Sequence, residues 1–177
     1  MALLKVKPPY AGTSSDPDKT IADINRLLRK YGINDYQWTT LWDQGLVELK
    51  LMIETPGADG KLRKIGIKVS PPIFNAKRRT WDTKKGRNVV QELPNYAQAM
   101  RLLFHWLKIK IEAVAFGLKE VEEEFMSDLI IRLPNGQEST VGKAFKPQIT
   151  ADGVTRLPQL ESGKPSHVVD AEWKEGS

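Results

Sequence analysis

The sequence contains no cysteine among its 177 residues. Without thiols the chain cannot form disulfides, use cysteine as a nucleophile or build most structural zinc sites. Because disulfides are typical of proteins in oxidising compartments, their absence leads us to expect a reducing one. No apolar run approaches the roughly 18 residues that a membrane-spanning helix needs. The first residues, MALLKVKPPYAG, have too short an apolar stretch for a signal peptide. These absences predict a cytoplasmic protein that does not enter a membrane.

Histidine is nearly absent too, since the chain holds only His105 and His167. His105 stands between Phe104 and Trp106 in a helical pattern, which is typical of a structural residue, and a general base would need an orienting partner that the sequence does not identify. The G-x-S-x-G, phosphate-loop and H-E-x-x-H patterns do not occur. We therefore expect no catalytic residues and no cofactor, and a binding protein rather than an enzyme.

Acidic residues gather after the long apolar stretch of the second half: Glu120, Glu122, Glu123, Glu124 and Asp128. Glu120 and Glu124 are one helical turn apart and could share a divalent ion. The same glutamates flank Val121 and Phe125, whose spacing marks a buried side, and this favours a solvated outer face. We predict no metal site, which leaves a metal-dependent nuclease as the weakest functional alternative.

Positive charge is concentrated in the first half of a chain whose net charge is +5. Residues 1–94 carry 17 Lys or Arg against 10 Asp or Glu, whereas residues 95–177 carry 10 against 12. Residues 75–87, NAKRRTWDTKKGR, contain six of these cations and one acid, Asp82. Clustered positive charge attracts polyanions through counterion release and long-range steering. Such a run also occurs in solvated loops, so its surroundings decide which interpretation holds.

The first half of the chain predicts a helix followed by strands. Residues 1–18, rich in Pro, Gly, Ser and Asp, are expected to form a flexible arm. A helix at about 19–31 has its apolar residues on one face, with Asp18 or Thr20 as its N-cap and Gly32 as its stop.

Alternating polarity follows, in DYQWTTLW, LVELKLMIE and KLRKIGIKVS. This pattern predicts a three-stranded antiparallel meander with one apolar and one solvated face, in which Gly66 marks a bulge or a close neighbour. Pro71 and Pro72 are expected to end the sheet, so the basic stretch 75–87 is predicted to be a loop that leaves a strand edge.

The second half predicts a long amphipathic helix over about 95–116, which Gly117 breaks or kinks. Residues 134–136 predict a tight turn, and Thr140 is expected to cap a short helix that Pro147 ends. From residue 151 polar residues dominate, which predicts a disordered tail. The fold class is therefore α+β, a single domain over 19–150 with both helices packed on the apolar face of the sheet.

Helix and turn motifs follow one another in a recognisable order. They are the helix pattern KTIADINRLLRKYG at 19–32, a second helix pattern with Trp106 and Ile109–Ala113, the turns EEEF at 122–125 and LPNG at 133–136, then TVG at 140–142 and PQI at 147–149. Over about 20–150 the chain resembles a group of small proteins encoded by tailed phages and prophages, although the meander and the basic stretch have no counterpart in that pattern. The resemblance implies a phage setting, in which nucleic-acid processing is common, and no particular chemistry.

Trp81 stands among the cations of the basic stretch, and this combination suggests single-stranded nucleic acid as the partner. Cations attract phosphates while an aromatic ring stacks on bases, so binding would be independent of sequence. The residues expected to bind nucleic acid are Lys77, Arg78, Arg79, Trp81, Lys84, Lys85 and Arg87, with Lys64 and Lys68 extending the positive field.

The C-terminal sequence SHVVDAEWKEGS is acidic and aromatic, and such a peptide can become ordered in a partner's groove. The residues expected to bind that protein partner are Val168, Val169, Asp170 and Trp173. The alternative function is therefore an interaction module, an inhibitor or adaptor of an enzyme, that acts through the long helix and this tail.

Overall fold

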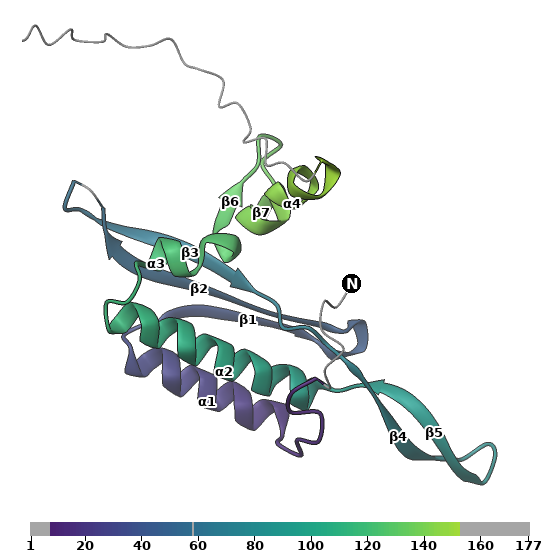
Figure 1. Ribbon diagram of the computed structural model, residues 1–177. Coiled ribbons are helices and arrows are strands. Elements are labelled where there is room, and N and C mark those ends of the chain that lie inside the picture. Colours follow the sequence, from purple (N-terminus) through teal and green to yellow (C-terminus); the bar gives the residue numbers. More distant parts are fainter. Residues whose placement is uncertain (1–7, 58, 153–177) are drawn as a thin grey trace, which may run out of the picture. The chain divides into compact units, whose positions relative to one another are not determined.

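The computed structural model describes residues 8–57 and 59–152, with side chains described up to residue 146. The chain divides into two compact units, Met1–Ala144 and Phe145–Ser177, and the elements below belong to the first except for the end of the last helix. Its fold class is α+β, as predicted (Figure 1). Within the described ranges no helix is long and apolar enough to cross a membrane. The predicted C-terminal tail lies outside the described residues from 153 onward.

The predicted meander is confirmed as a three-stranded antiparallel sheet in the order β1-β2-β3. Its strands are β1 Asp35–Leu41, β2 Leu46–Pro56 and β3 Leu62–Val69, with a short 3-10 helix η1 Trp42–Gln44 between the first two. Leu49 in the central strand lies opposite Trp38 of β1 and Val69 of β3. The central strand buries Val47, Leu49 and Leu51 on one face, as its alternation predicts.

Helix α1, Pro17–Lys30, begins earlier than predicted, and its N-cap is Asp16 rather than Asp18 or Thr20. The carboxylate of Asp16 accepts a hydrogen bond from the Asp18 backbone N–H at 2.9 Å. Pro17 fits the first helical position because its missing N–H would have had no intrahelical partner there. Thr20 is buried instead, and its hydroxyl donates to the Asp16 carbonyl oxygen.

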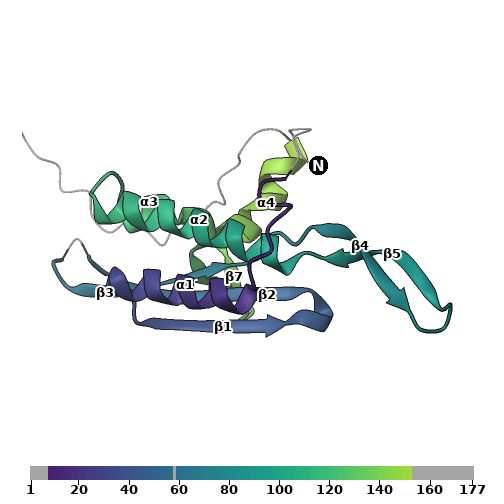
Figure 2. The ribbon, with the colours of Figure 1, turned by 90° about the horizontal axis from the view of Figure 1, so that it is seen from below.

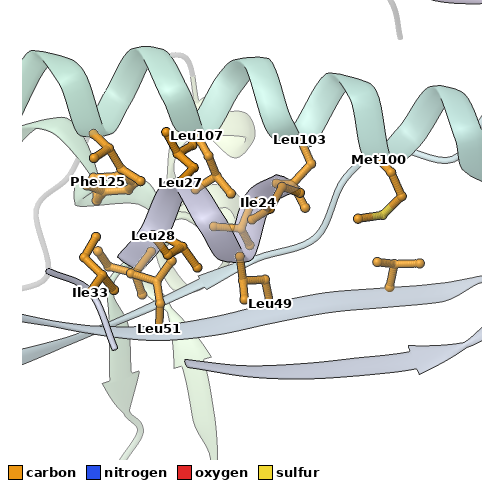
Figure 3. Close-up of a cluster of buried hydrophobic side chains, with 14 of the residues drawn as sticks. Ile24, Leu27, Leu28, Ile33, Leu49, Leu51, Met100, Leu103, Leu107 and Phe125 are labelled. Carbon is orange, nitrogen blue, oxygen red and sulfur yellow. The ribbon is translucent and has the colours of Figure 1, made fainter. Parts of the chain in front are cut away.

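Helix α2, Tyr96–Ala115, is the predicted long helix, capped by the Asn95 side chain, which accepts from the Gln98 N–H. Gly117, at φ +70°, ends it rather than kinking it, because Gly117 and Leu118 donate their N–H groups back to the carbonyls of its last turn. Helices α1 and α2 lie side by side on the apolar face of the sheet (Figures 1 and 2). The core between them contains Ile24, Leu28, Leu49, Leu51, Met100, Leu103, Leu107 and Phe125 (Figure 3).

Part of the predicted flexible arm is packed against the start of α2. The Gln98 side chain donates to the Pro9 carbonyl at 2.7 Å, and the Asn95 side chain donates to the Ala11 carbonyl at 3.3 Å. The Tyr10 ring stacks on His105, with centroids 4.8 Å apart. His105 is thus a half-buried structural residue, and burial together with nearby cations lowers its pKa.

The chain after α2 forms short elements: α3 Val121–Glu124, η2 Met126–Asp128, β6 Ile130–Arg132, β7 Glu138–Thr140 and α4 Val141–Asp152. Strands β6 and β7 form a small hairpin around the predicted turn at 134–136, where Gly136 has a φ of +80°. A Cβ atom on Gly66 would come within 3.2 Å of the Ile130 side chain, which is a tight contact. This close approach of Ile130 explains why a glycine stands in β3. The face of β2 and β3 that we expected to be solvated is therefore partly covered.

Helix α4 follows Thr140, whose hydroxyl accepts from the Lys143 N–H as the predicted cap. The prediction that Pro147 ends this helix is wrong, since α4 continues to Asp152. A proline inside a helix removes one backbone hydrogen bond and crowds the preceding turn, which can kink a helix without ending it.

Candidate nucleic-acid interface

The basic stretch is not a loop but the first strand and tip of a β-hairpin. Strand β4, Asn75–Asp82, pairs antiparallel with β5, Arg87–Pro94, through an unbroken register from Asn75 opposite Pro94 to Asp82 opposite Arg87. The loop prediction failed because this hairpin lacks the alternation of buried apolar and exposed polar residues by which strands are recognised. In the described residues, β4 and β5 form a separate two-stranded sheet, which projects away from the helices (Figures 1 and 2).

The tip of the hairpin is ordered by its one acid. The Asp82 carboxylate accepts hydrogen bonds from the backbone N–H groups of Lys84 at 2.9 Å and Lys85 at 3.2 Å. The Lys85 ammonium lies 3.8 Å from the other carboxylate oxygen. Gly86 has a φ of +57°, a conformation that glycine adopts without steric cost. The side chains of Lys84 and Lys85 are thereby presented at the far end of the hairpin.

The register separates the hairpin's side chains into two faces. Residues directly opposite each other share a face, so Lys77, Arg79 and Trp81 lie on one face. Their cross-strand partners are Glu92, Val90 and Asn88. Every one of these six side chains is exposed, Trp81 and Val90 to 62% each. An exposed tryptophan diagonal to an exposed valine is an apolar patch within a basic surface.

The opposite face carries Arg78 and Arg87 and is partly covered. Thr80 and Val89, which lie opposite each other, are half-buried there. Arg78 donates to the Asn95 side-chain oxygen at 3.5 Å, and the Asn95 N–H donates to the Phe74 carbonyl. Asn95 also caps α2, so a single residue joins the base of the hairpin to the body of the protein.

Most of the hairpin's cations lack an acidic partner. The hairpin contains six cations, Lys77, Arg78, Arg79, Lys84, Lys85 and Arg87, against the two acids Asp82 and Glu92. Among the described residues, Lys77, Arg79, Lys84 and Arg87 have no acid within ion-pair distance. Glu92 lies opposite Lys77 in the register but does not come within 4.0 Å of its ammonium. Cations without partners keep their full attraction for an external anion.

Lys64 and Lys68, which we expected to extend the positive field, are paired with acids of the three-stranded sheet. Lys68 pairs with Glu48 at 2.8 Å, and both side chains are at most 21% exposed. Lys64 lies 3.6 Å from Asp35 and 3.7 Å from Glu54. Both lysines project from the sheet rather than the hairpin. The structure therefore gathers seven of the nine predicted nucleic-acid residues on the hairpin and separates Lys64 and Lys68 from them.

The acidic segment after α2 is held by lysines. Glu124 accepts from the Lys110 ammonium at 2.8 Å and lies 3.9 Å from Lys119. The hydrogen bond from Lys110 lowers the pKa of Glu124. No set of three acidic or histidine side chains within the described part of the chain is arranged to hold a metal ion. The predicted partner-binding residues Val168, Val169, Asp170 and Trp173 lie outside the described residues.

A second surface lies along one flank of α2, the long helix that the sequence already offered for a protein partner without indicating which of its faces. At the inner edge of this flank Trp106 packs against the buried Phe125. Leu102, Trp106, Ile109, Ala113 and Phe116 follow one another at spacings of four, three, four and three residues. Ile109 is 68% and Phe116 73% exposed, whereas the core side of the same helix is buried. Leu102 and Trp106 also line a groove of about 350 Å³ together with Val69, Pro71 and Pro72. Such spacing is that of a helix seam that packs on a second helix.

Comparison of the chain with protein-family models, with curated proteins and with solved structures finds no match.

Proposed function

We propose that this protein binds nucleic acid without sequence preference, through the hairpin β4–β5. The observation that supports the proposal most strongly is the set of cations that lack acidic partners on a projecting hairpin beside the exposed ring of Trp81. Each cation that neutralises a phosphate releases a condensed counterion, which favours binding. The ring adds base or sugar contact that does not depend on salt.

The proposed setting is phage replication or recombination in a host cytoplasm. It rests on the resemblance of residues 20–150 to small tailed-phage proteins, and the hairpin supplies a physical reason for a nucleic-acid partner. The described residues contain no helix-turn-helix or zinc-finger arrangement that would support base-specific recognition, so the phosphate backbone is the proposed target.

The proposal can be tested with two variants that remove equal charge from different places. The hairpin-neutral variant replaces the four unpaired hairpin cations by glutamine: Lys77→Gln, Arg79→Gln, Lys84→Gln and Arg87→Gln. The body-neutral variant removes four exposed cations outside the hairpin: Lys19→Gln, Lys61→Gln, Arg132→Gln and Lys143→Gln. Both variants have the same net charge, so a difference between them reports position rather than total charge.

Binding to labelled nucleic acid, measured by fluorescence anisotropy at about 50 mM salt, should weaken at least about tenfold in the hairpin-neutral variant. The body-neutral variant should bind within about threefold of the wild type, because its cations are not gathered at one surface. Equal weakening in the two variants, or no binding by the wild type, would remove the basis of the proposal.

The second candidate function is a protein-interaction module, and the observation that favours it is the exposure of Ile109 and Phe116 on one flank of α2. A partner's amphipathic helix would pack along Leu102, Trp106, Ile109 and Phe116, as helices do in a groove or a helix pair. Ile109→Glu with Phe116→Glu should abolish stoichiometric co-purification of such a partner. Leu62→Glu, a change at a side chain 71% exposed elsewhere, is the matched control and should retain it. Partner retention in the double variant would dismiss this candidate.

A further inference from the structure

We propose that the hairpin's ligand is double-stranded DNA and that β4 and β5 enter its major groove together. This inference rests on the proposed function and replaces single strands, which the sequence suggested, by a duplex. The change follows from the basic stretch being a paired ribbon instead of a loop. A loop can fold around a flexible strand, whereas a ribbon with a complete register presents a fixed shape.

The shape of the hairpin fits a duplex groove. The hairpin has eight cross-strand pairs, from Asn75–Pro94 to Asp82–Arg87, and at about 3.3 Å per residue it is roughly 26 Å long. It is a convex projection, and convex surfaces fit concave ligands. The major groove of B-form DNA, about 12 Å wide, admits a two-stranded ribbon, whereas the minor groove is about 6 Å wide. A protein site for single strands is usually itself a groove that follows the strand.

Positive charge is distributed around the whole ribbon. Lys77 and Arg79 lie on one face, Arg78 and Arg87 lie on the other, and Lys84 and Lys85 lie at the tip. A single strand lying across the Trp81 face would leave the two arginines of the opposite face unused. A duplex groove places a phosphate backbone on each side of an inserted ribbon, so cations on both faces can reach phosphates.

The hairpin contains little aromatic surface for stacking on bases. Single-strand sites stack successive bases on several rings. Trp81 is the only aromatic residue in 75–94, and its exposed neighbour on the same face is Val90. One ring with one aliphatic side chain makes a poor stacking platform. Such a pair is better suited to an apolar contact on the floor of the major groove, beside the phosphate contacts that supply the sequence-independent affinity.

The experiment measures the affinity of the protein for a DNA duplex of about 20 base pairs, which is longer than the hairpin, and for each of its two single strands at the same salt concentration. The full-length protein should bind the duplex at least roughly tenfold more tightly than either strand. Methyl green, which occupies the major groove, should compete with the protein, and netropsin, which occupies the minor groove, should not. Val90→Asn, which changes no charge, should weaken duplex binding because it removes the aliphatic half of the Trp81–Val90 patch, whereas Val90→Ile should retain it.

The outcomes separate this inference from the proposed function. Equal or tighter binding of single strands, lost in the hairpin-neutral variant, would overturn the duplex inference and leave the proposed function standing. Duplex binding displaced by netropsin alone would overturn the major-groove placement. Absence of binding to both forms, or binding unchanged in the hairpin-neutral variant, would overturn both. The inference requires that the protein prefers the duplex, that this binding depends on the four hairpin cations, and that methyl green competes with it.

Discussion

Charged residues are used in opposite ways in the sheet-and-helix body and in the hairpin. In the body, the least exposed lysines are matched with acids on neighbouring elements, as in Lys68–Glu48 at 2.8 Å and Lys110–Glu124 at 2.8 Å, and Lys50 pairs with Glu138 at 2.7 Å. In the hairpin, two acids face six cations, and Trp81 is mostly exposed while every large side chain in the body's centre is buried. Groups that stabilise a fold are paired or buried, so the hairpin's unpaired groups are available for a ligand.

The same comparison explains why the hairpin keeps its shape without a core. An isolated two-stranded hairpin is marginally stable in water. Here the tip is ordered by Asp82, and the base is joined to α2 through Asn95. The two ends of the hairpin are thus fixed by polar contacts, so the side chains of the Trp81 face between them are not needed to hold its shape.

The largest expected effect on folding is in the body's core. Leu107 is fully buried between α2 and the sheet, and Leu107→Ala should lower the free energy of unfolding by about 2–5 kcal/mol. Val90→Ala, a truncation at an exposed hairpin site, should change it by less than about 0.5 kcal/mol. Chemical denaturation of both variants measures the contrast. A large loss for Val90→Ala would mean that the hairpin belongs to the core.

A smaller effect is expected at the Lys110–Glu124 pair, whose side chains are 17% and 16% exposed. The Lys110 ammonium also lies over the rings of Trp106 and Phe125. Lys110→Met should cost about 1–3 kcal/mol, because it leaves the Glu124 carboxylate poorly paired. Adding Glu124→Gln should restore part of the loss, which a double-mutant cycle measures. Strictly additive losses would mean that the pair does not couple.

The pair also predicts a pH dependence. Lys110 lowers the pKa of Glu124 from its ordinary 4.5 by donating a hydrogen bond, and this outweighs partial burial. A carboxyl whose folded pKa is lowered contributes stability above its unfolded pKa, and that stability is lost as the pH falls below about 4.5 through the folded value. Thermal unfolding between pH 7 and pH 3 should therefore show a smaller acid loss in Glu124→Gln than in the wild type. Parallel curves for the two proteins would exclude this contribution.

The smallest expected effect on folding belongs to the cations of the hairpin. The hairpin-neutral variant should unfold within about 0.5 kcal/mol of the wild type, because none of its four side chains has an ion-pair partner in the described structure. Differential scanning calorimetry at low salt gives the comparison. A marked stabilisation would also be informative, since it would show that mutual repulsion in the hairpin strains the fold.

Periodicity predicted the parts of the fold that bury an apolar face. The 3–4 spacing of α1 and α2 and the alternation of Val47, Leu49 and Leu51 are direct consequences of that burial, and all three are present in the structure. The hairpin and the three-residue strands β6 and β7 escaped prediction because backbone pairing, rather than side-chain burial, defines them.

The candidate site was predictable in composition but not in arrangement. The basic stretch is visible in the sequence, and its residues do gather on one element. Lys64 pairs with Asp35 and Glu54, and Lys68 pairs with Glu48. These acids lie on neighbouring strands, so the sequence alone does not show that the sheet register makes them partners. The exposed Val90 beside Trp81 likewise follows from the register of β5 against β4.

The most direct test of the account is the salt dependence of duplex affinity in the wild type and the hairpin-neutral variant. The slope of log affinity against log salt is about −0.9 for each duplex phosphate neutralised, so four lost contacts should flatten it by up to roughly 3.6. The body-neutral variant should keep the wild-type slope. A hairpin-neutral slope equal to that of the wild type, with binding intact, would contradict the assignment of nucleic-acid binding to β4 and β5.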